Sequence, residues 1–208
     1  KIIFLRGLYG KSILSPFNKT WRAKRKYAGG GILLDQGIHI VDLMQLFCDE
    51  FVEVKSFISN SYWKCDVEDN AYAIMRSKSG VVATLHSSAT QWQHRFSLEI
   101  GLEEGFLELR GILTGTRSYG EEKLVIGKRN GSGSLTGADQ EEITTYLIDH
   151  SWSDEINELA EVIVNGGSIQ SGSVEDALNT MKLVYQIYWA DPTWREANNI
   201  PNPNDYNR

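Results

Sequence analysis

Three side chains between residues 29 and 42 could carry out proton chemistry. The stretch reads GGGILLDQGIHIVD and contains Asp35, Asp42 and His39, one of only four histidines in the chain. Spacings of four and then three residues would place all three along one stripe of a helix. An imidazole has an ordinary pKa of ~6.5, and a nearby carboxylate favours its protonated form. The pattern therefore predicts His39 as a proton acceptor, with Asp35 as a hydrogen-bonding carboxylate one turn earlier.

Two other interpretations of this stripe stay open. His39 and Asp42 could simply satisfy backbone groups at the edge of a packed helix. Asp35 and His39, one turn apart, could also share a divalent ion. No further cluster of His or Cys in the sequence supports a metal, so we expect no metal site.

Gly29–Gly31 lead into the apolar pattern of this helix. Three glycines in a row cost backbone entropy on folding, but they let a ligand or another backbone segment come close. The free amides of a helix N-terminus also attract anions. A tight entry loop without any ligand is the alternative, and the glycines alone do not decide between them.

The segment Lys19–Lys26 places five cations and Trp21 within eight residues of a chain whose net charge is -6. A solvated loop would explain this local excess. A phosphate, nucleotide or carboxylate partner is the alternative, with Arg22 able to make a bidentate contact.

The other polar and aromatic residues favour structural roles. Val67–Asn70 (VEDN) enters a strand and is interpreted as the end of a turn. The remaining histidines are interpreted as structural or capping residues, and one aromatic set as packing; these are His86, His94 and His150, and Trp92, Phe96, Tyr185, Tyr188 and Trp189.

Alternating and β-branched patterns predict strands over residues 1–9, 51–62, 70–76, 81–92, 96–102, 106–109 and 142–148. Helical spacing predicts helices over 31–48, over 153–164 with Ser153 as the cap and Gly166 as the end, and from Ser173 to Asp191. Gly127–Asp139, rich in Gly and Ser, predicts a mobile loop.

Short connections between so many strands imply a mostly antiparallel sheet, so the predicted fold class is α+β: an open sheet with helices packed on one face. A subunit partner could cover the other face. The length of 208 residues fits a single domain over 1–208. The opening KIIFLRG lies inside a strand and lacks a methionine, which suggests a piece of a longer protein.

Composition excludes several classes of protein. A net charge of -6 argues against a nucleic-acid binder, and no apolar run reaches the ~18 residues of a membrane span. No signal peptide opens the chain, and Cys48 and Cys65 form no C-x-x-C pair, so we expect a protein of the reducing cytoplasm.

The order of motifs resembles the C-terminal domain of the glucose-fructose oxidoreductase / inositol dehydrogenase / MocA-like (Gfo/Idh/MocA) oxidoreductases. The matching pieces are LRGLYGK, WR followed by GGGILLDQGIHIVDL, VEDNAYAIMRSKSGVVATLHSSATQW and the closing HSWSDEINELAEVIVNGG…SGSVEDALNTMKLVYQIYWA. The D-x-G-x-H-x-x-D element is the most specific of them, and the resemblance covers nearly the whole chain.

The resemblance implies a fold like the C-terminal domain of glyceraldehyde-3-phosphate dehydrogenase, whose open sheet face often builds dimers or tetramers. It also implies an N-terminal Rossmann domain that binds NAD or NADP. Neither its G-x-G-x-x-G turn nor the family's E-K-P lysine occurs in this chain. The chain is therefore expected to be the substrate-binding domain, with no cofactor-binding residues of its own and no activity alone.

Carried over by motif position, His39 would be the acid/base of hydride transfer between the nicotinamide and a hydroxyl of a sugar, nucleotide sugar or cyclitol. Asp35 would bind and position that hydroxyl, and Trp21 and Arg22 resemble substrate contacts. Two rival functions follow from variation within the family. One is a non-catalytic oligomerisation or ligand-binding module, and the other is an NAD-dependent glycosidase.

Overall fold

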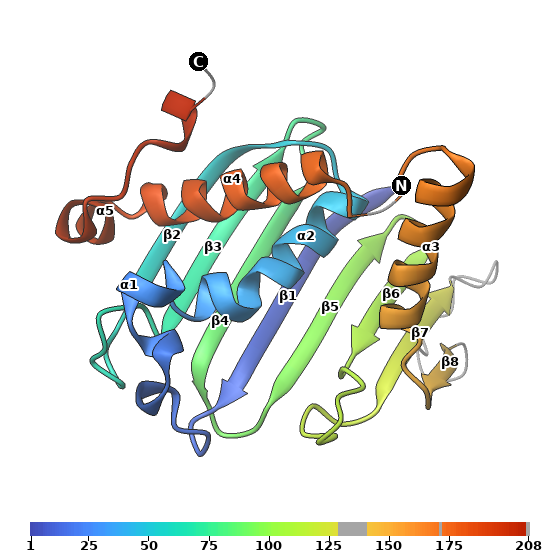
Figure 1. Ribbon diagram of the computed structural model, residues 1–208, viewed down its shortest axis with the longest axis horizontal. Helices are drawn as coiled ribbons and strands as arrows, with labels where there is room; N and C mark the ends of the chain where they lie inside the picture. The colour runs from blue at the N-terminus through green and yellow to red at the C-terminus, as the bar shows by residue number, and fades with distance from the viewer. Residues whose placement is uncertain (129–140, 171, 207–208) are drawn as a thin grey trace.

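A computed structural model describes residues 1–128, 141–170 and 172–206. Its centre is an eight-stranded sheet with the strand order β2-β3-β4-β1-β5-β6-β7-β8 (Figure 1). The strands are β1 (Ile2–Ser12), β2 (Phe51–Ser59), β3 (Asn70–Ser77), β4 (Val82–Gln91), β5 (Arg95–Leu102), β6 (Gly105–Arg110), β7 (Glu122–Lys128) and β8 (Glu141–Tyr146).

Helices and short helical turns make up most of the remaining structure. They are η1 (Phe17–Lys19), η2 (Trp21–Ala23), α1 (Arg25–Ala28), the π-helical turn η3 (Leu33–Gly37), α2 (Ile38–Phe47), α3 (Ser151–Asn165), α4 (Val174–Ala190), α5 (Pro192–Asn198) and η5 (Pro203–Tyr206). No helix in the described part of the chain is long and apolar enough to cross a membrane.

The sheet is mixed but mostly antiparallel, as predicted. Every neighbouring pair is antiparallel except β1 and β4, which run side by side in the same direction. The two strands therefore end at the same edge of the sheet, where the chain continues into the loops that follow Ser12 and Gln91. This edge receives the beginning of the glycine-led helix.

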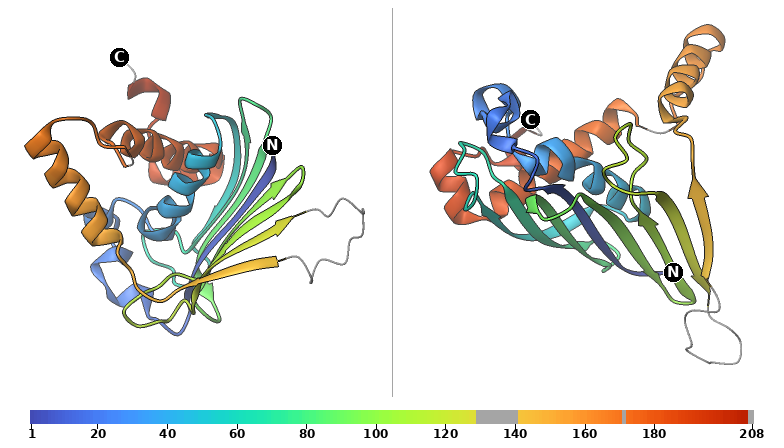
Figure 2. Two further views of the ribbon diagram at one scale, coloured as in Figure 1. Left: turned by 90° about the vertical axis from the view of Figure 1, so that its right-hand side faces the viewer. Right: turned by 90° about the horizontal axis from the view of Figure 1, so that it is seen from below.

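The helices gather on one face of the sheet, which confirms the α+β prediction (Figure 2). Helices α2 and α4 pack on β1 to β5 and close the main core between them. The alternation of β3 shows the two faces directly, because Ala73 and Met75 are buried while Tyr72 and Ile74 are exposed. Burial of one residue in two is the pattern of a sheet that is covered on one side only.

The uncovered face carries a row of large side chains at matched register. Phe57 on β2 lies opposite Tyr72 on β3, which lies opposite His86 on β4 and, through it, Leu8 on β1. The Tyr72 and His86 rings stack with centroids 4.1 Å apart. Phe57 and Tyr72 are both exposed, so an apolar patch runs across four strands.

Several predicted boundaries differ in informative ways. Ser173 caps α4 through a full capping box with Asp176, and Gly166 ends α3, both as predicted. Ser153 is not the cap of α3, because that helix already begins at Ser151 and the Ser153 hydroxyl donates to the His150 carbonyl.

Strand β7 was not predicted from the sequence. Its C-terminal end includes Gly127, so the predicted mobile loop over Gly127–Asp139 begins too early. The rest of that predicted loop, from residue 129 onward, lies outside the described residues.

Candidate active site

The predicted helix begins with a π-helical turn that carries Asp35, and His39 follows on the first turn of α2. Asp35 is half-buried and His39 is exposed, so both side chains can reach a small molecule at this edge of the sheet. Gly37 between them packs against β4, where an added Cβ would lie 2.7 Å from the Ser87 hydroxyl. The glycine of the D-x-G-x-H element is thus needed for close packing on the sheet.

Asp42 and Asp35 contact different elements of the structure. The Asp42 carboxylate accepts a hydrogen bond of 2.8 Å from the Thr180 hydroxyl, and Thr180 is buried on α4. Asp42 therefore ties α2 to α4, whereas the Asp35 carboxylate accepts a hydrogen bond from Arg22.

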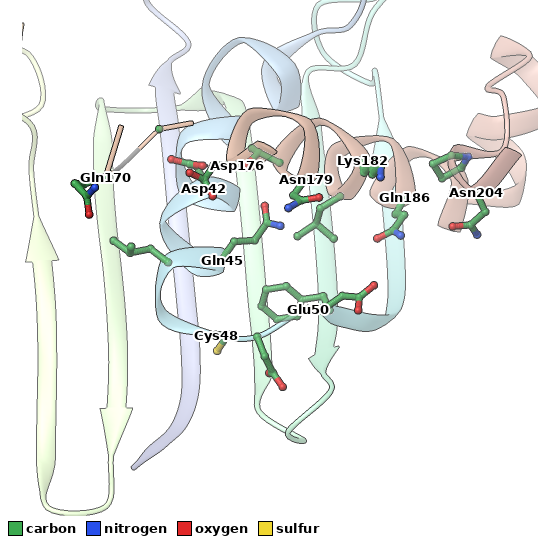
Figure 3. A pocket seen from close by; sticks show the side chains of 17 residues that line it. Asp42, Gln45, Cys48, Glu50, Gln170, Asp176, Asn179, Lys182, Gln186 and Asn204 are labelled. Carbon is green, nitrogen blue, oxygen red and sulfur yellow. The ribbon is translucent and has the colours of Figure 1, made fainter. Parts of the chain in front are cut away.

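Asp42 also lines a polar groove of about 680 Å³ between α2 and α4. Figure 3 shows Asp42 and Gln45 on α2 beside Asp176, Asn179 and Lys182 on α4.

The glycine triplet is explained by another part of the chain. The buried Glu68 carboxylate accepts hydrogen bonds from the amides of Gly31 (2.8 Å) and Leu33 (3.0 Å) and from the Tyr188 hydroxyl (2.6 Å). A Cβ on Gly31 would lie 2.1 Å from the Glu68 backbone oxygen. Of the alternatives left open by the sequence, close approach of another backbone segment is the one observed. The free amides at the start of the helix are satisfied by a carboxylate of the chain itself.

The segment Val67–Asn70 was predicted only to end a turn, and the role of Glu68 in binding the start of the helix was not predicted. Glu68 is fully buried, and burial raises the pKa of its carboxyl while its three donors act in the opposite direction. The adjacent Asp69 carboxylate accepts hydrogen bonds from the amides of Tyr62 and Trp63. The segment thus fixes the loop before β3 and the turn that leads into α2 together. In the sequence, only the adjacent acidic residues Glu68 and Asp69 just before a predicted strand could have indicated this role.

Arg22 forms an ion pair with Asp35. Its Nε donates to the Asp35 carboxylate at 2.9 Å, and its guanidinium lies over the Trp21 ring, 4.7 Å from the centroid. Trp21 itself is more than half exposed. Arg25 is held by Asp66, through its own backbone amide and through its side chain. Arg22 and Arg25 of the basic segment are therefore hydrogen bonded within the chain.

Two tyrosines complete the surroundings of His39. Tyr9 at the end of β1 lies with its ring centroid 6.2 Å from that of His39 and 5.4 Å from that of Tyr119. The Tyr119 hydroxyl accepts a hydrogen bond of 2.9 Å from Gln36, the neighbour of Asp35. Burial raises the pKa of both hydroxyls, and the nearby Asp35 carboxylate adds to the effect, so both keep their protons. Neither tyrosine was singled out from the sequence.

Some of the other histidines and aromatic residues have the structural roles predicted for them, and Trp92 does not. His86 is structural as predicted, with its ring bonded to Asn70 and stacked on Tyr72. Tyr188 is buried but also bonds Glu68, whereas Trp92, predicted to pack, is 77% exposed. The prediction for Trp92 is wrong because its strand ends at Gln91, which leaves the side chain beyond the sheet.

The described residues differ from two common kinds of cofactor site. No group of three or more His, Cys, Asp or Glu side chains within residues 1–128, 141–170 and 172–206 is placed to hold a metal ion. The parallel pair β1 and β4 lacks the glycine-rich strand-to-helix turn that cradles a dinucleotide. These two strands therefore form no dinucleotide cradle of that type.

Comparison with known proteins identifies the class. A family profile described as the GFO/IDH/MocA C-terminal domain matches residues 1–108. The chain belongs to the GFO/IDH/MocA family and represents its C-terminal domain.

Among curated proteins, a 1,5-anhydro-D-fructose reductase of Ensifer adhaerens is 32% identical over 103 residues. This match covers 49% of the present chain and 31% of the reductase. The matched segment thus spans about a third of the length of that relative.

Solved structures of similar fold extend the comparison to the closing helices. An aldose-aldose oxidoreductase from Caulobacter crescentus, solved with glycerol, has a TM-score of 0.70 at 22% identity and covers 94% of this chain and 54% of its own. A levoglucosan dehydrogenase solved with NADH and L-sorbose has a TM-score of 0.69 at 18% identity, and the match covers 93% of this chain and 57% of the dehydrogenase. A UDP-N-acetylglucosamine 3-dehydrogenase from Acidithiobacillus ferrooxidans has a TM-score of 0.70 at 17% identity, covering 93% and 55%. At these identities the likeness establishes the fold.

Proposed function

We propose that this chain is the substrate-binding domain of an NAD(P)-dependent oxidoreductase that acts on a hydroxyl of a sugar, nucleotide sugar or cyclitol. The observation that carries the proposal is the placement of Asp35 and His39, half-buried and exposed, at one edge of the sheet in a chain of this family. The structures with similar folds are named for reactions on carbohydrates, and the levoglucosan dehydrogenase was solved with NADH.

In the proposed reaction His39 would accept the O–H proton of the substrate carbinol, and NAD(P), held by a Rossmann domain outside this chain, would supply the hydride acceptor. The Asp35 carboxylate would accept a hydrogen bond from a substrate hydroxyl and so position it. Arg22 holds Asp35 in place, and Trp21 offers an exposed ring to the substrate beside it.

The same proposal covers the organisation of the protein. Residues 1–208 would form one substrate-binding and oligomerisation domain that works with a Rossmann domain outside this chain, where NAD or NADP is bound. The apolar row of Phe57, Tyr72 and Leu8 on the open sheet face supports a homodimer or homotetramer built through that face. Cys48 and Cys65 are free thiols, which suits a cytoplasmic protein.

The proposal is tested with the intact protein that contains this chain. Turnover of NAD(P)-linked oxidation is measured over a panel of sugars and nucleotide sugars for wild type and for His39→Ala. Loss of the base should lower turnover roughly 10²–10⁴-fold with folding retained. His150→Ala is the matched control, because His150 is exposed at the start of α3, and it should keep wild-type turnover. Near-normal turnover of His39→Ala would overturn the assignment.

A further inference from the structure

A second cavity, of about 640 Å³, opens beside the candidate active site. It lies between the segment that follows β1, the connection from β4 to β5 and the connection from β6 to β7. Its volume is within the range of pockets that bind small organic molecules. Neither the proposed proton transfer nor the binding of the reacting hydroxyl uses it.

Tyr119 forms the wall that the cavity shares with the active site. On one side its hydroxyl is hydrogen bonded to Gln36, next to Asp35, and its ring meets that of Tyr9 beside His39. On the other side its ring lies 4.7 Å from that of His94, which lines the cavity. A molecule that reacts at His39 could therefore extend past Tyr119 into this space.

Trp92 gives the cavity an aromatic surface. Its indole is 77% exposed, although its backbone is fixed by a hydrogen bond from the Ser12 hydroxyl to the Trp92 carbonyl at 3.1 Å. A large apolar ring that is open to solvent can bind the C–H face of a pyranose. Arg117 and His94 line the same cavity; the guanidinium can donate to sugar hydroxyls, and so can the His94 Nε2, because the His94 Nδ1 accepts from the Ser12 amide.

The geometry points to a second carbohydrate subsite, in which Trp92, His94 and Arg117 bind a second sugar ring glycosidically linked to the ring that reacts at His39. The substrate class is thereby narrowed to glycosides larger than a monosaccharide. This inference rests on the proposed function. Tyr119 separates the two rings, with its hydroxyl held toward Gln36 on the reacting side.

The test compares sugars of one and two rings on the intact protein. We would measure kcat/KM for D-glucose and D-galactose and for the disaccharides maltose, cellobiose and lactose. At least one disaccharide should exceed its monosaccharide, and Trp92→Ala should lower its kcat/KM about tenfold while monosaccharide values stay within about twofold. Trp152→Ala is the matched control, because Trp152 on α3 is equally exposed but lies outside the cavity.

Two results would overturn the subsite: Trp92→Ala lowering mono- and disaccharide values equally, or leaving both unchanged. A Trp92 dependence seen only with UDP-glucose would assign the cavity to a nucleotide and also contradict the inference. If wild type oxidises none of these sugars, the proposed function fails on this panel. Calorimetric binding of the same disaccharides to wild type and Trp92→Ala then tests the subsite separately, and equal affinity would reject it.

Discussion

Helices α2 and α3 both carry apolar residues at helical spacing, but they have very different surroundings. On α2, Ile40, Val41 and Met44 are buried in the main core. On α3 no residue is buried, and an apolar stripe is open to solvent along its length: Trp152, Ile156, Leu159 and Ile163. Figure 2 shows α3 projecting away from the sheet while α2 lies flat against it.

The difference shows where this chain concentrates its stability. Helix α2 and the turn before it are tied to the loop before β3 by Glu68, to β4 by the close packing of Gly37, and to α4 by the bond from Thr180 to Asp42. Each tie comes from a different element, so the positions of Asp35 and His39 are fixed by the core itself. An active site gains precision when rigid elements hold it in this way.

The largest expected effect comes from Gly31→Val in the intact protein. Any Cβ there meets the Glu68 backbone oxygen at 2.1 Å, and backbone cannot move aside as a flexible side chain can. We expect a loss of about 4 kcal/mol or more in the free energy of unfolding, measured by urea titration. Gly115→Val is the control, since a Cβ at Gly115 has no neighbour within 4 Å, and it should change stability little. Equal effects of the two substitutions would contradict the tight anchor.

Glu68→Gln should change how stability depends on pH. Burial raises the pKa of the Glu68 carboxyl in the folded protein above its ordinary value of 4.5. The folded state therefore keeps a proton that the unfolded state releases, and stability falls as the pH rises from 4.5 through the folded pKa. Glutamine does not titrate, so the stability of wild type minus that of the variant should fall between pH 4 and pH 7.5.

Unfolding titrations at the two pH values measure this difference. A difference that increases with pH would show that the three donors lower the pKa more than burial raises it. Glu53→Gln serves as the control, because Glu53 pairs with Arg76 at the surface and should contribute little at either pH.

The tie between α2 and α4 should be weaker. Thr180→Val removes the hydroxyl that donates to Asp42 and should cost about 1 kcal/mol. In a double-mutant cycle with Asp42→Ala, which removes the acceptor, the double variant should lose less than the sum of the two single losses, because each single variant already breaks the same bond. Strict additivity would show that the two side chains do not interact in solution.

The smallest effect is expected on α3. Ile163→Ala removes apolar surface that is already 73% exposed, so it should change stability by less than about 0.5 kcal/mol. Ile40→Ala on the buried face of α2 should cost about 2–5 kcal/mol in the same protein. A loss above about 2 kcal/mol at Ile163 would show that the stripe is packed in the intact protein and would remove the contrast.

Much of the secondary structure could be predicted from local patterns in the sequence. Alternation located most of the strands, and the capping box at Ser173 located the start of α4. Pairing was less accessible, since nothing local indicates that β1 lies parallel to β4. Nor does helical spacing of apolar residues reveal whether the apolar face is covered: it predicts both helices, and only α2 has buried residues.

The sequence alone predicts two candidate residues of the site but not the residues that surround them. Asp35 and His39 stand out because their types and spacing lie within one short segment. Glu68 lies 35 residues from Leu33, and Tyr119 lies 83 residues from Gln36, so only tertiary folding brings them together. The π-helical turn also escaped prediction, because it depends on packing against β4 as well as on local propensity.

The central claim is that His39 accepts the substrate proton, and the pH–rate profile of the intact protein tests it most directly. NAD(P)-linked oxidation of the best sugar is followed from pH 5 to pH 9 in wild type and in His39→Ala. We predict that wild-type kcat/KM falls on the acid side as the base becomes protonated, and that the variant is slower and lacks this acid limb. The same acid limb in both proteins would show that the base is another group and would contradict the account.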